Sequence, residues 1–345
     1  MYLKLSVLLS FLFISCKKYV DEPNPRVTFE ISDLLVNKNT NVRALEINEQ
    51  HLVAATSNGE IYLMDLENER ELIVVHRSPK QDSIKNNFRA VAYQNKNTFA
   101  ISIENPARLY KNGQLVYKEI HPTVFYNAMA FWNDNEGVAM GDATENCLSL
   151  IVTRDGGNTW HKIPCEELPK GDGTESAFAA SNSNIKIIGD KVWIATGGFK
   201  SDIYHSHDRG HTWKIIKTPI VQGAETTGIY AVDFYDENHG FAIGGDYESP
   251  KENKKNKIKT SDGGNTWKVV AENKFPGYRS CVQYIPNSKA NKIVAVGFEG
   301  IAYSKDKGKS WKELSKESFY TIRFLNDSVA FAAGKGRISK IKFNL

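Results

Sequence analysis

The sequence has few cysteines, few methionines and almost no excess of either charge. Four Cys and four Met occur in 345 residues, which excludes a small fold held together by disulfides. The 44 basic and 40 acidic side chains leave a net charge of +4 at pH 7. This excess is too small and too dispersed to predict nucleic-acid binding. With 41% hydrophobic and 24% charged residues, the composition is globular, and disordered and collagen-like classes are excluded.

Long apolar runs are also missing, except at residues 5–14 near the N-terminus. That run is too short for a permanent transmembrane helix and is typical of a secretory signal. It ends in Phe-Ile-Ser-Cys at residues 13–16, which resembles the bacterial lipobox; a plain secretory signal is the alternative. We therefore expect a signal peptide at residues 1–15, a lipidated Cys16, and a tether at residues 16–25. The expected location is the bacterial cell envelope, lipid-anchored and facing the periplasm.

Three cysteines remain beyond this leader. Cys147 and Cys165 flank a predicted hairpin whose turn lies at residues 155–158, almost midway between them. An exported protein could form a disulfide there, although two free thiols remain the alternative. Cys281 lies in an apolar strand pattern and is expected in the core.

Four segments share the pattern Ser/Thr-x-Asp-x-Gly-x-Thr/Ser-Trp, and we call them the repeat turns. Their Asp residues recur every 44 to 54 positions, a period typical of propeller blades. The Asp carboxylate can accept N–H groups across its own turn, and the Gly allows a positive φ. The Trp starts the next strand and packs inside the blade. Because every repeat needs them, these residues are predicted to be structural rather than catalytic: Asp155, Gly157, Trp160, Asp208, Gly210, Trp213, Asp262, Gly264, Trp267, Asp306, Gly308 and Trp311.

Strand patterns extend this repeat over residues 26–345 and predict an all-β, seven-bladed β-propeller with four-stranded blades. The predicted blades span residues 38–78, 86–120, 123–165, 175–218, 226–272 and 277–314, and a seventh begins at 318. The seventh has only three strands before the chain ends. Residues 26–31 alternate correctly for a strand, so we expect them to complete it and to close the ring.

The connectivity predicts a functional face. Inner strands begin and second strands end on one side of the ring, here called the funnel face, and the repeat turns lie on the other. Clustered charges around an axial funnel suit an anionic or polyhydroxylated ligand; a solvated ring of salt bridges is the alternative. The candidate ligand-binding residues are Arg43, Arg89, Asn127, Asp142, Glu175, Tyr230, Asp246, Tyr247, Arg279 and Glu299.

Two resemblances rest on these motifs. The repeat turns resemble the Asp-box, or BNR, repeat. Phe-Ala-Ala-Ser at residues 178–181 and Trp-Ile-Ala-Thr-Gly-Gly at residues 193–198 resemble signatures of the bacterial photosystem II stability/assembly factor-like propellers. That resemblance implies an extracytoplasmic, non-catalytic assembly factor that binds other proteins. Some members are labelled oxidoreductases, but residues 171–173 and 334–336 lack the third glycine of a dinucleotide fingerprint. We therefore expect no cofactor.

Asp-box proteins also include sialidases, which need an arginine cluster, a Tyr nucleophile with a Glu, and an acidic acid/base residue. Arg43, Arg89 and Arg279 with the catalytic candidates Tyr230, Glu175 and Asp246 supply these types. The Arg-Ile-Pro segment typical of sialidases is absent, and the predicted blade count is seven rather than the six of that class. The leading hypothesis is thus a non-catalytic propeller that binds a protein or envelope component through its funnel face. The alternative is a glycan-binding protein or a sialidase-like hydrolase acting on acidic glycans.

Two further motifs are interpreted as structural. His205, His207 and His211 could share a strand face as metal ligands, but Asp208 is needed in the repeat turn, so no metal site is predicted. The basic insertion at residues 251–257 is expected to be a solvated loop. We expect a monomer that contacts the membrane only through its lipid and does not bind nucleic acid.

Overall fold

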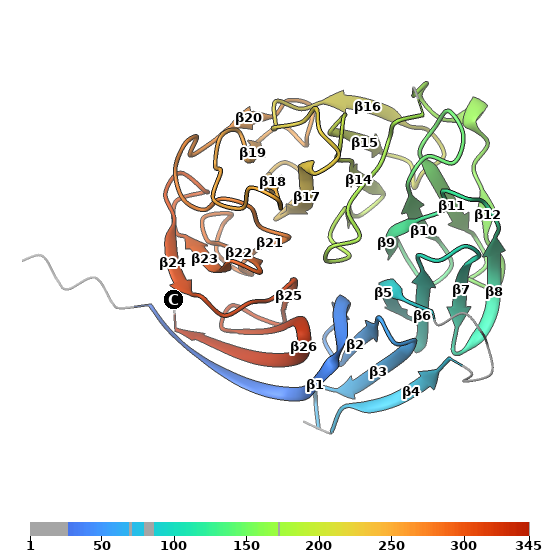
Figure 1. Cartoon of the computed structure of the whole chain (residues 1–345), viewed down its shortest axis with the longest axis horizontal. Coiled ribbons are helices and arrows are strands. Elements are labelled where there is room, and N and C mark those ends of the chain that lie inside the picture. The colour runs from blue at the N-terminus through green and yellow to red at the C-terminus, as the bar shows by residue number, and fades with distance from the viewer. Residues whose placement is uncertain (1–26, 69–70, 79–85, 172, 345) are drawn as a thin grey trace, which may run out of the picture.

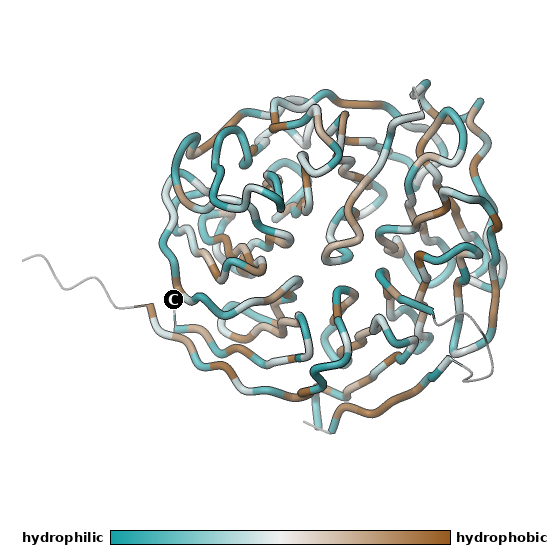
Figure 2. The backbone as a smooth tube through the Cα atoms, viewed as in Figure 1, coloured by the Kyte–Doolittle hydropathy of each residue, from teal (hydrophilic) through white to brown (hydrophobic). Residues whose placement is uncertain are grey.

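The computed structural model describes residues 27–68, 71–78, 86–171 and 173–344. Its strands form a ring of sheets around a central axis, as expected for a β-propeller (Figure 1). Figure 2 shows hydrophobic residues along the strands of every sheet. The predicted signal peptide, Cys16 and the tether lie outside the described residues. Within the described part, no helix has the length and apolar character needed to cross a membrane.

Hydrogen bonding groups the strands into six antiparallel sheets. The largest consists of β25 (Thr321–Phe324), β26 (Val329–Asn344), β1 (Thr28–Ile47), β2 (His51–Thr56), β3 (Glu60–Asp65) and β4 (Ile73–Arg77). Two four-stranded sheets follow, with β5 (Phe88–Gln94), β6 (Asn97–Ser102), β7 (Ala107–Lys111) and β8 (Gln114–Glu119), and with β9 (Tyr126–Phe131), β10 (Gly137–Gly141), β11 (Ser149–Thr153) and β12 (His161–Lys162). The short 3₁₀ helix η1 (Cys165–Glu167) follows β12.

The remaining three sheets also have four strands each. They consist of β13 (Ile185–Ile188), β14 (Lys191–Ala195), β15 (Asp202–Ser206) and β16 (Lys214–Lys217), of β17 (Thr227–Phe234), β18 (Gly240–Asp246), β19 (Lys257–Thr260) and β20 (Lys268–Val269), and of β21 (Cys281–Tyr284), β22 (Ile293–Gly297), β23 (Gly300–Ser304) and β24 (Lys312–Ser315).

The prediction of seven separate blades is therefore wrong, because the structure has six. The cause is the 20-residue strand β1, whose first half pairs with β26 and whose second half pairs with β2. This continuous strand joins the predicted first and last blades into one six-stranded sheet. The ring still has seven inner strands, β1, β5, β9, β13, β17, β21 and β25, because the large sheet contributes two of them.

The N-terminal strand closes the ring as expected. Phe29 of β1 pairs with Phe343 of β26, and the register continues from Thr28 opposite Asn344 to Val36 opposite Arg337. Arg337 and Ser339 of β26 both donate to the Asp33 carboxylate. Both ends of the described chain are thus held in one sheet, and this removes an edge that would otherwise be open at the closure point.

The core consists of apolar side chains packed between neighbouring sheets. Second strands carry small residues such as Ala54, Ala100 and Ala139, all fully buried, which lets adjacent sheets approach closely. Larger rings fill the wider gaps: the Trp193 ring stacks on Phe234 of the next sheet with centroids 3.8 Å apart. The sheets are therefore tied to one another mainly by hydrophobic contact.

The repeat turns have the local geometry predicted for them. In the first, Asp155 Oδ1 accepts the backbone N–H groups of Asn158 and Thr159 and the Thr153 hydroxyl, and Asp155 Oδ2 accepts the Thr159 hydroxyl. Gly157 has a φ of 78° and donates its N–H to Thr153 Oγ1. Asp208, Asp262 and Asp306 repeat the bonds to the following Thr or Ser. Both oxygens of each carboxylate thus accept hydrogen bonds within their own turn, which agrees with a structural rather than a catalytic role.

A disulfide joins Cys147 and Cys165, whose Cα atoms lie 5.6 Å apart. It ties the loop before β11 to η1 beyond the first repeat turn. Cys281 is a buried free thiol, as predicted.

The repeat-turn carboxylates predict a loss of stability in acid. Partial burial acts to raise the pKa of Asp262, but bonds from the Thr266 hydroxyl and N–H and from Thr260 outweigh it and lower that pKa. Because the pKa of this carboxyl is lower in the folded than in the unfolded chain, its ionisation stabilises the fold at pH values above the unfolded pKa near 3.8. This contribution disappears as pH falls through the folded pKa. We expect Asp262→Asn to lose about 1 kcal/mol at pH 7 and progressively less as pH falls below 3.8, measured by urea unfolding. Asp327→Asn, at an exposed aspartate with no hydrogen bond among the described residues, should change neither value.

The disulfide predicts a redox-dependent stability. It closes a loop with a sequence separation of 18, for which the chain-entropy account gives about 3 kcal/mol. Reduction should lower the free energy of unfolding by that order. A Cys147→Ser/Cys165→Ser protein should show the same low value and no response to reductant; equal stability of the oxidised and reduced wild type would contradict the expectation.

Candidate functional site

The centre of the ring is occupied by the chain itself. Residues 177–184, here called the axial segment, run into the axis before β13 begins at Ile185 (Figure 1). The prediction that an inner strand starts at Glu175 is therefore wrong. The physical reason is the run Ser-Asn-Ser at residues 181–183, whose side chains bond to residues of several other sheets instead of continuing a ladder.

Two arginines hold the axial segment on the funnel face. Arg43 of β1 donates to the Ala180 carbonyl at 3.4 Å, and Arg89 of β5 donates to the Ala179 carbonyl at 3.1 Å. Across the axis, the Ser181 hydroxyl donates to the Ser280 carbonyl at 2.6 Å. The predicted funnel is thus partly filled, and part of its arginine hydrogen bonding is used internally.

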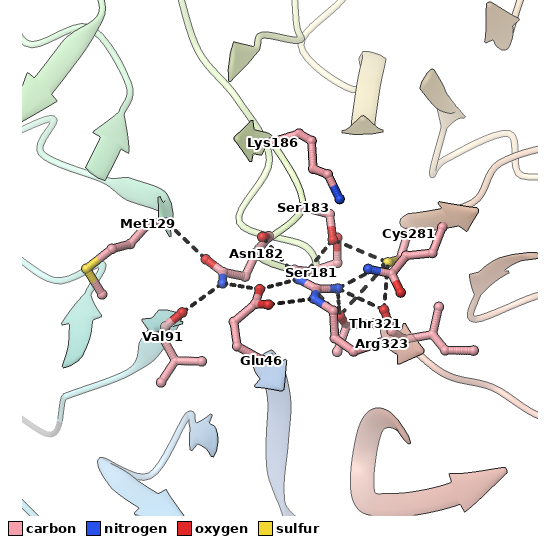
Figure 3. A network of polar contacts seen from close by, with 12 residues as sticks. Glu46, Val91, Met129, Ser181, Asn182, Ser183, Lys186, Cys281, Thr321 and Arg323 are labelled. Atoms are coloured by element: carbon pink, nitrogen blue, oxygen red, sulfur yellow. Dashed lines mark hydrogen bonds and ion pairs between the residues drawn. The ribbon is translucent and has the colours of Figure 1, made fainter. Parts of the chain in front are cut away.

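Asn182 is the centre of the next layer (Figure 3). Its Oδ1 accepts the Met129 N–H at 3.0 Å, and its Nδ2 donates to the Val91 carbonyl at 2.9 Å and to Glu46 Oε1 at 2.8 Å. The Arg323 guanidinium pairs with Glu46 and also donates to the Ser181 and Asn182 carbonyls. Asn182 and the Arg323 contacts therefore tie the axial segment to β1, β5, β9 and β25, and Ser183 adds contacts to Val232 of β17 and Cys281 of β21.

Asp142 and Asn127 hold the start of the axial segment. Asp142 Oδ1 accepts the Ala177 N–H at 2.9 Å and the Asn127 amide at 2.7 Å. Burial raises the pKa of Asp142 to about 6, although both hydrogen bonds act to lower it. Both residues were predicted to bind a ligand, and in the structure both position the chain that fills the funnel.

Arg43 and Arg89 remain partly exposed on the funnel face. The Arg43 guanidinium lies 3.8 Å from the centre of the Tyr320 ring, and Arg89 Nε donates to Asn87 Oδ1. Burial, together with the nearby Arg43 charge, lowers the pKa of Arg89 to about 10, so Arg89 stays charged at neutral pH. Among the described residues, neither forms an ion pair with a carboxylate, although the nearby Glu104 charge acts to raise the pKa of Arg89.

Aromatic rings continue from these two arginines across the funnel face. Phe178 of the axial segment stacks on Tyr230 with centroids 3.7 Å apart, and Tyr230 contacts Tyr247 and Tyr278 edge-on. Tyr278 in turn contacts Phe298 at 5.1 Å. The outer members are open to solvent: Phe199, Tyr247 and Phe298 are 52%, 45% and 36% exposed. We call these three residues the aromatic arc, because they follow the second strands of three successive sheets, one residue in each sheet.

Arg279 does not belong to the same surface as Arg43 and Arg89, which corrects the predicted three-arginine cluster. It is 2% exposed, donates to its neighbouring Tyr278 carbonyl, and lies over the Phe275 ring. Burial lowers its pKa to about 10. Burial of the Lys257 ammonium, and to a smaller extent the nearby Arg279 charge, lower the pKa of Lys257 to about 7. The surroundings of Arg279 are the wall between two sheets and not the funnel.

The catalytic candidates are not arranged for hydrolysis. Tyr230 is 2% exposed and its hydroxyl donates to the Thr226 carbonyl at 2.8 Å; burial raises its pKa far above the usual range, which disfavours a nucleophilic phenolate. Glu175 is buried and accepts the Gly173 N–H, while Asp246 accepts the Glu248 N–H within its own turn. The geometric support for a sialidase-like site is thereby lost.

The other predicted positions are placed as follows. Glu299 is exposed beside Phe298 on the funnel face. His205 stacks on Trp193 and its Nδ1 contacts the Val192 carbonyl, so its ring is used in packing. The 251–257 insertion is exposed at Lys251 and Lys254, but it ends in the fully buried Lys257.

Two glycines allow this crowded face to form. A Cβ on Gly197 would lie 2.2 Å from the Phe178 ring, and one on Gly244 would lie 1.8 Å from the Gly228 carbonyl oxygen. Each belongs to a Gly-Gly pair at or just after the end of a second strand, at residues 197–198 and 244–245. Their role is close packing around the axial segment.

Sequence reasoning missed Phe199, Phe298 and Tyr320. A signal was available for Phe298, because it adjoins Glu299, which was predicted to lie on the funnel face. It also missed the axial segment, for which the missing strand alternation at residues 177–184 was the only sign.

Comparisons with known proteins support the fold. The chain matches no protein-family model. It likewise matches no curated protein sequence. Among solved structures, YCF48 bound to a D1 peptide is similar over 91% of this chain and 94% of that one, with 12% identity and a TM-score of 0.61. YCF48 from Cyanidioschyzon merolae gives 11% identity over 91% and 98%, with a TM-score of 0.60. The RRP9 WD40 repeats give 10% identity over 91% and 97%, with a TM-score of 0.62. At these identities the likeness shows the propeller fold alone, and it agrees with the predicted resemblance to photosystem II assembly-factor propellers at that level.

The Asp142 environment predicts a measurable titration. We expect its carboxyl to titrate near pH 6 by carbon-detected NMR, with Asp142→Asn identifying the signal. Because the pKa of Asp142 is higher in the folded than in the unfolded chain, the protonated carboxyl stabilises the fold at pH values below its unfolded pKa. That contribution is lost as pH rises through about 6. The free energy of unfolding of the wild type relative to Asp142→Asn should therefore fall between pH 4 and pH 7. A carboxyl titrating below pH 4.5 would contradict the assignment.

Proposed function

We propose that this protein is a non-catalytic, lipid-anchored propeller of the cell envelope that binds a segment of another protein on its funnel face, in an assembly or scaffold role. The observation that carries the proposal is the aromatic arc on the same face as Arg43 and Arg89, which bond to carbonyls of the axial segment but form no ion pair among the described residues. Exposed aromatic rings and arginines are the side chains that dominate protein–protein binding energy.

The rigidity of the face favours this role. The rings of Phe178, Tyr230 and Tyr278 pack against one another below the exposed Tyr247 and Phe298. Little side-chain freedom is then lost when a partner covers them. The Arg43 and Arg89 charges at the edge suit an acidic side chain or a terminal carboxylate on the bound segment.

The comparisons agree with a protein partner. One similar structure is YCF48 with a bound D1 peptide, and another is a WD40-repeat propeller. The lipobox-like residues 13–16 support the proposal of a lipid anchor. The resemblance of the repeat turns to the Asp-box supports the proposal of an Asp-box propeller. A lipidated Cys16 would be followed by about ten tether residues before β1, enough to reach roughly 30 Å when extended.

The test uses Tyr247 and Phe298, the two rings of the arc that contact the packed Tyr230 and Tyr278 rings. Tyr247→Ser/Phe298→Ser should remove specific partners recovered by affinity purification from the source cells, because each lost aromatic anchor typically costs about 2 kcal/mol or more. Both side chains are exposed, so the melting temperature should change little. A photo-crosslinking residue placed at position 247 should then attach to the same partner directly.

The matched control is Leu115→Ser/Ile120→Ser. These residues are also exposed, at 50% and 71%, but they lie in and just after the outer strand β8. If both double variants recover the same proteins in equal amounts, the funnel face is not the binding surface. Loss of partners with the control alone would move the interface to the outer wall.

A further inference from the structure

The seven inner strands present one equivalent side chain each to the axis on the side of the repeat turns. The strand register shows that these positions are equivalent. Each of the side chains belongs to a residue that pairs with the same position of the second strand: Glu46 lies opposite Val53, Asp233 opposite Phe241, and Arg323 opposite Phe331, for example. In ring order the side chains are Glu46, Ala92, Ala130, Lys186, Asp233, Gln283 and Arg323.

These seven residues line a cavity of about 280 Å³, which we call the axial cavity. Its inner end is closed by Asn182 and Ser183 of the axial segment. Its mouth is on the repeat-turn face, because the inner strands end there: the turn after β9 accepts the N–H of Gly156 in the first repeat turn. Ala92 and Ala130 leave one side open, whereas charged and amide groups gather on the other.

The acidic groups of the cavity are already bonded. Glu46 accepts two bonds from Arg323 and one from Asn182. Asp233 accepts from Lys186 at 2.7 Å through Oδ1 and from the Tyr284 N–H at 2.7 Å through Oδ2. Every carboxylate oxygen therefore has a donor, and the acids add little further attraction for a cation.

Donors, by contrast, remain available. An ammonium group has three N–H donors, and Lys186 uses one of them, on Asp233. Figure 3 shows the Lys186 ammonium reaching toward the Asn182–Arg323 network. Gln283 accepts the Phe324 N–H through Oε1, and its Nε2 has no partner among the described residues. The cavity thus offers several N–H groups and few free acceptors.

We propose that the axial cavity binds a small free carboxylate of two to four carbon atoms. One carboxylate would accept from Lys186 and from Gln283 Nε2, and its carbon chain would lie over Ala92 and Ala130. The cavity is at the small end of ligand sites, which excludes a folded protein segment. This site lies on the face opposite the aromatic arc, so it goes beyond the proposed function and is independent of it.

The test is a calorimetric titration of the mature protein with sodium acetate and sodium succinate, with sodium chloride as the counter-ion control at constant ionic strength. We expect saturable binding of one carboxylate per chain. Lys186→Met should weaken it at least about tenfold, since a hydrogen bond to a charged group is lost. Ala130→Leu should abolish it by filling the cavity while leaving every charged group in place.

Two controls make the outcome decisive. Lys191→Met removes a lysine that also pairs with a carboxylate at 2.7 Å, that of Glu237, but outside the cavity, and it should bind as the wild type does. Tyr247→Ser/Phe298→Ser should also bind normally. Absence of saturable binding in the wild type, unchanged binding in Ala130→Leu, or equal weakening in Lys191→Met would each overturn the proposal. Circular dichroism of each variant establishes that it is folded.

Discussion

The pairing of β1 with β26 is the constraint on which the rest of the structure depends. It holds the N-terminal and C-terminal strands in one sheet, with Phe29 opposite Phe343 and Asp33 bonded to Arg337 and Ser339. Without a closed ring, the inner strands would not converge, and neither the funnel face nor the axial cavity would exist. The second half of β1, which carries Arg43 and Glu46, is itself an inner strand paired with β2. Pairing of the first half with β26 therefore also fixes where these two residues lie relative to the axis.

The axial segment then divides the centre of this ring into two chemically different ends. On the funnel face its carbonyls take up the arginine donors, and Phe178 joins a stack of aromatic rings. On the other face Asn182 and Ser183 form the floor of a polar cavity. The axial segment thus separates the surface for which we propose a protein partner from the small pocket for which we propose a carboxylate. In a propeller with an open channel these two ends would be continuous.

Much of the local structure was predictable, because local signals do not depend on the rest of the chain. The repeat turns need only their own Asp, Gly and Thr or Ser, and their hydrogen bonds follow the prediction. The alternation in residues 26–31 was enough to predict ring closure. The blade count was wrong because a residue pattern reports strands and turns, and it cannot show that β1 continues from one sheet position into the next. The three-arginine cluster failed for a similar reason, since the strand register alone does not say that Arg279 turns into the wall between sheets.

The sequence by itself determined the strand order, the repeat turns, the two faces of the ring and the closing strand, because each is encoded within a few neighbouring residues or in their spacing. Only the tertiary structure decided which side chains meet at the axis. Glu46 and Arg323 lie almost a whole chain apart and still form an ion pair. Asn182 bonds to Met129, Val91 and Glu46, which lie 53, 91 and 136 positions earlier, only because the ring brings them together. Contacts of that kind depend on how seven inner strands converge on one line, and no local pattern specifies that convergence.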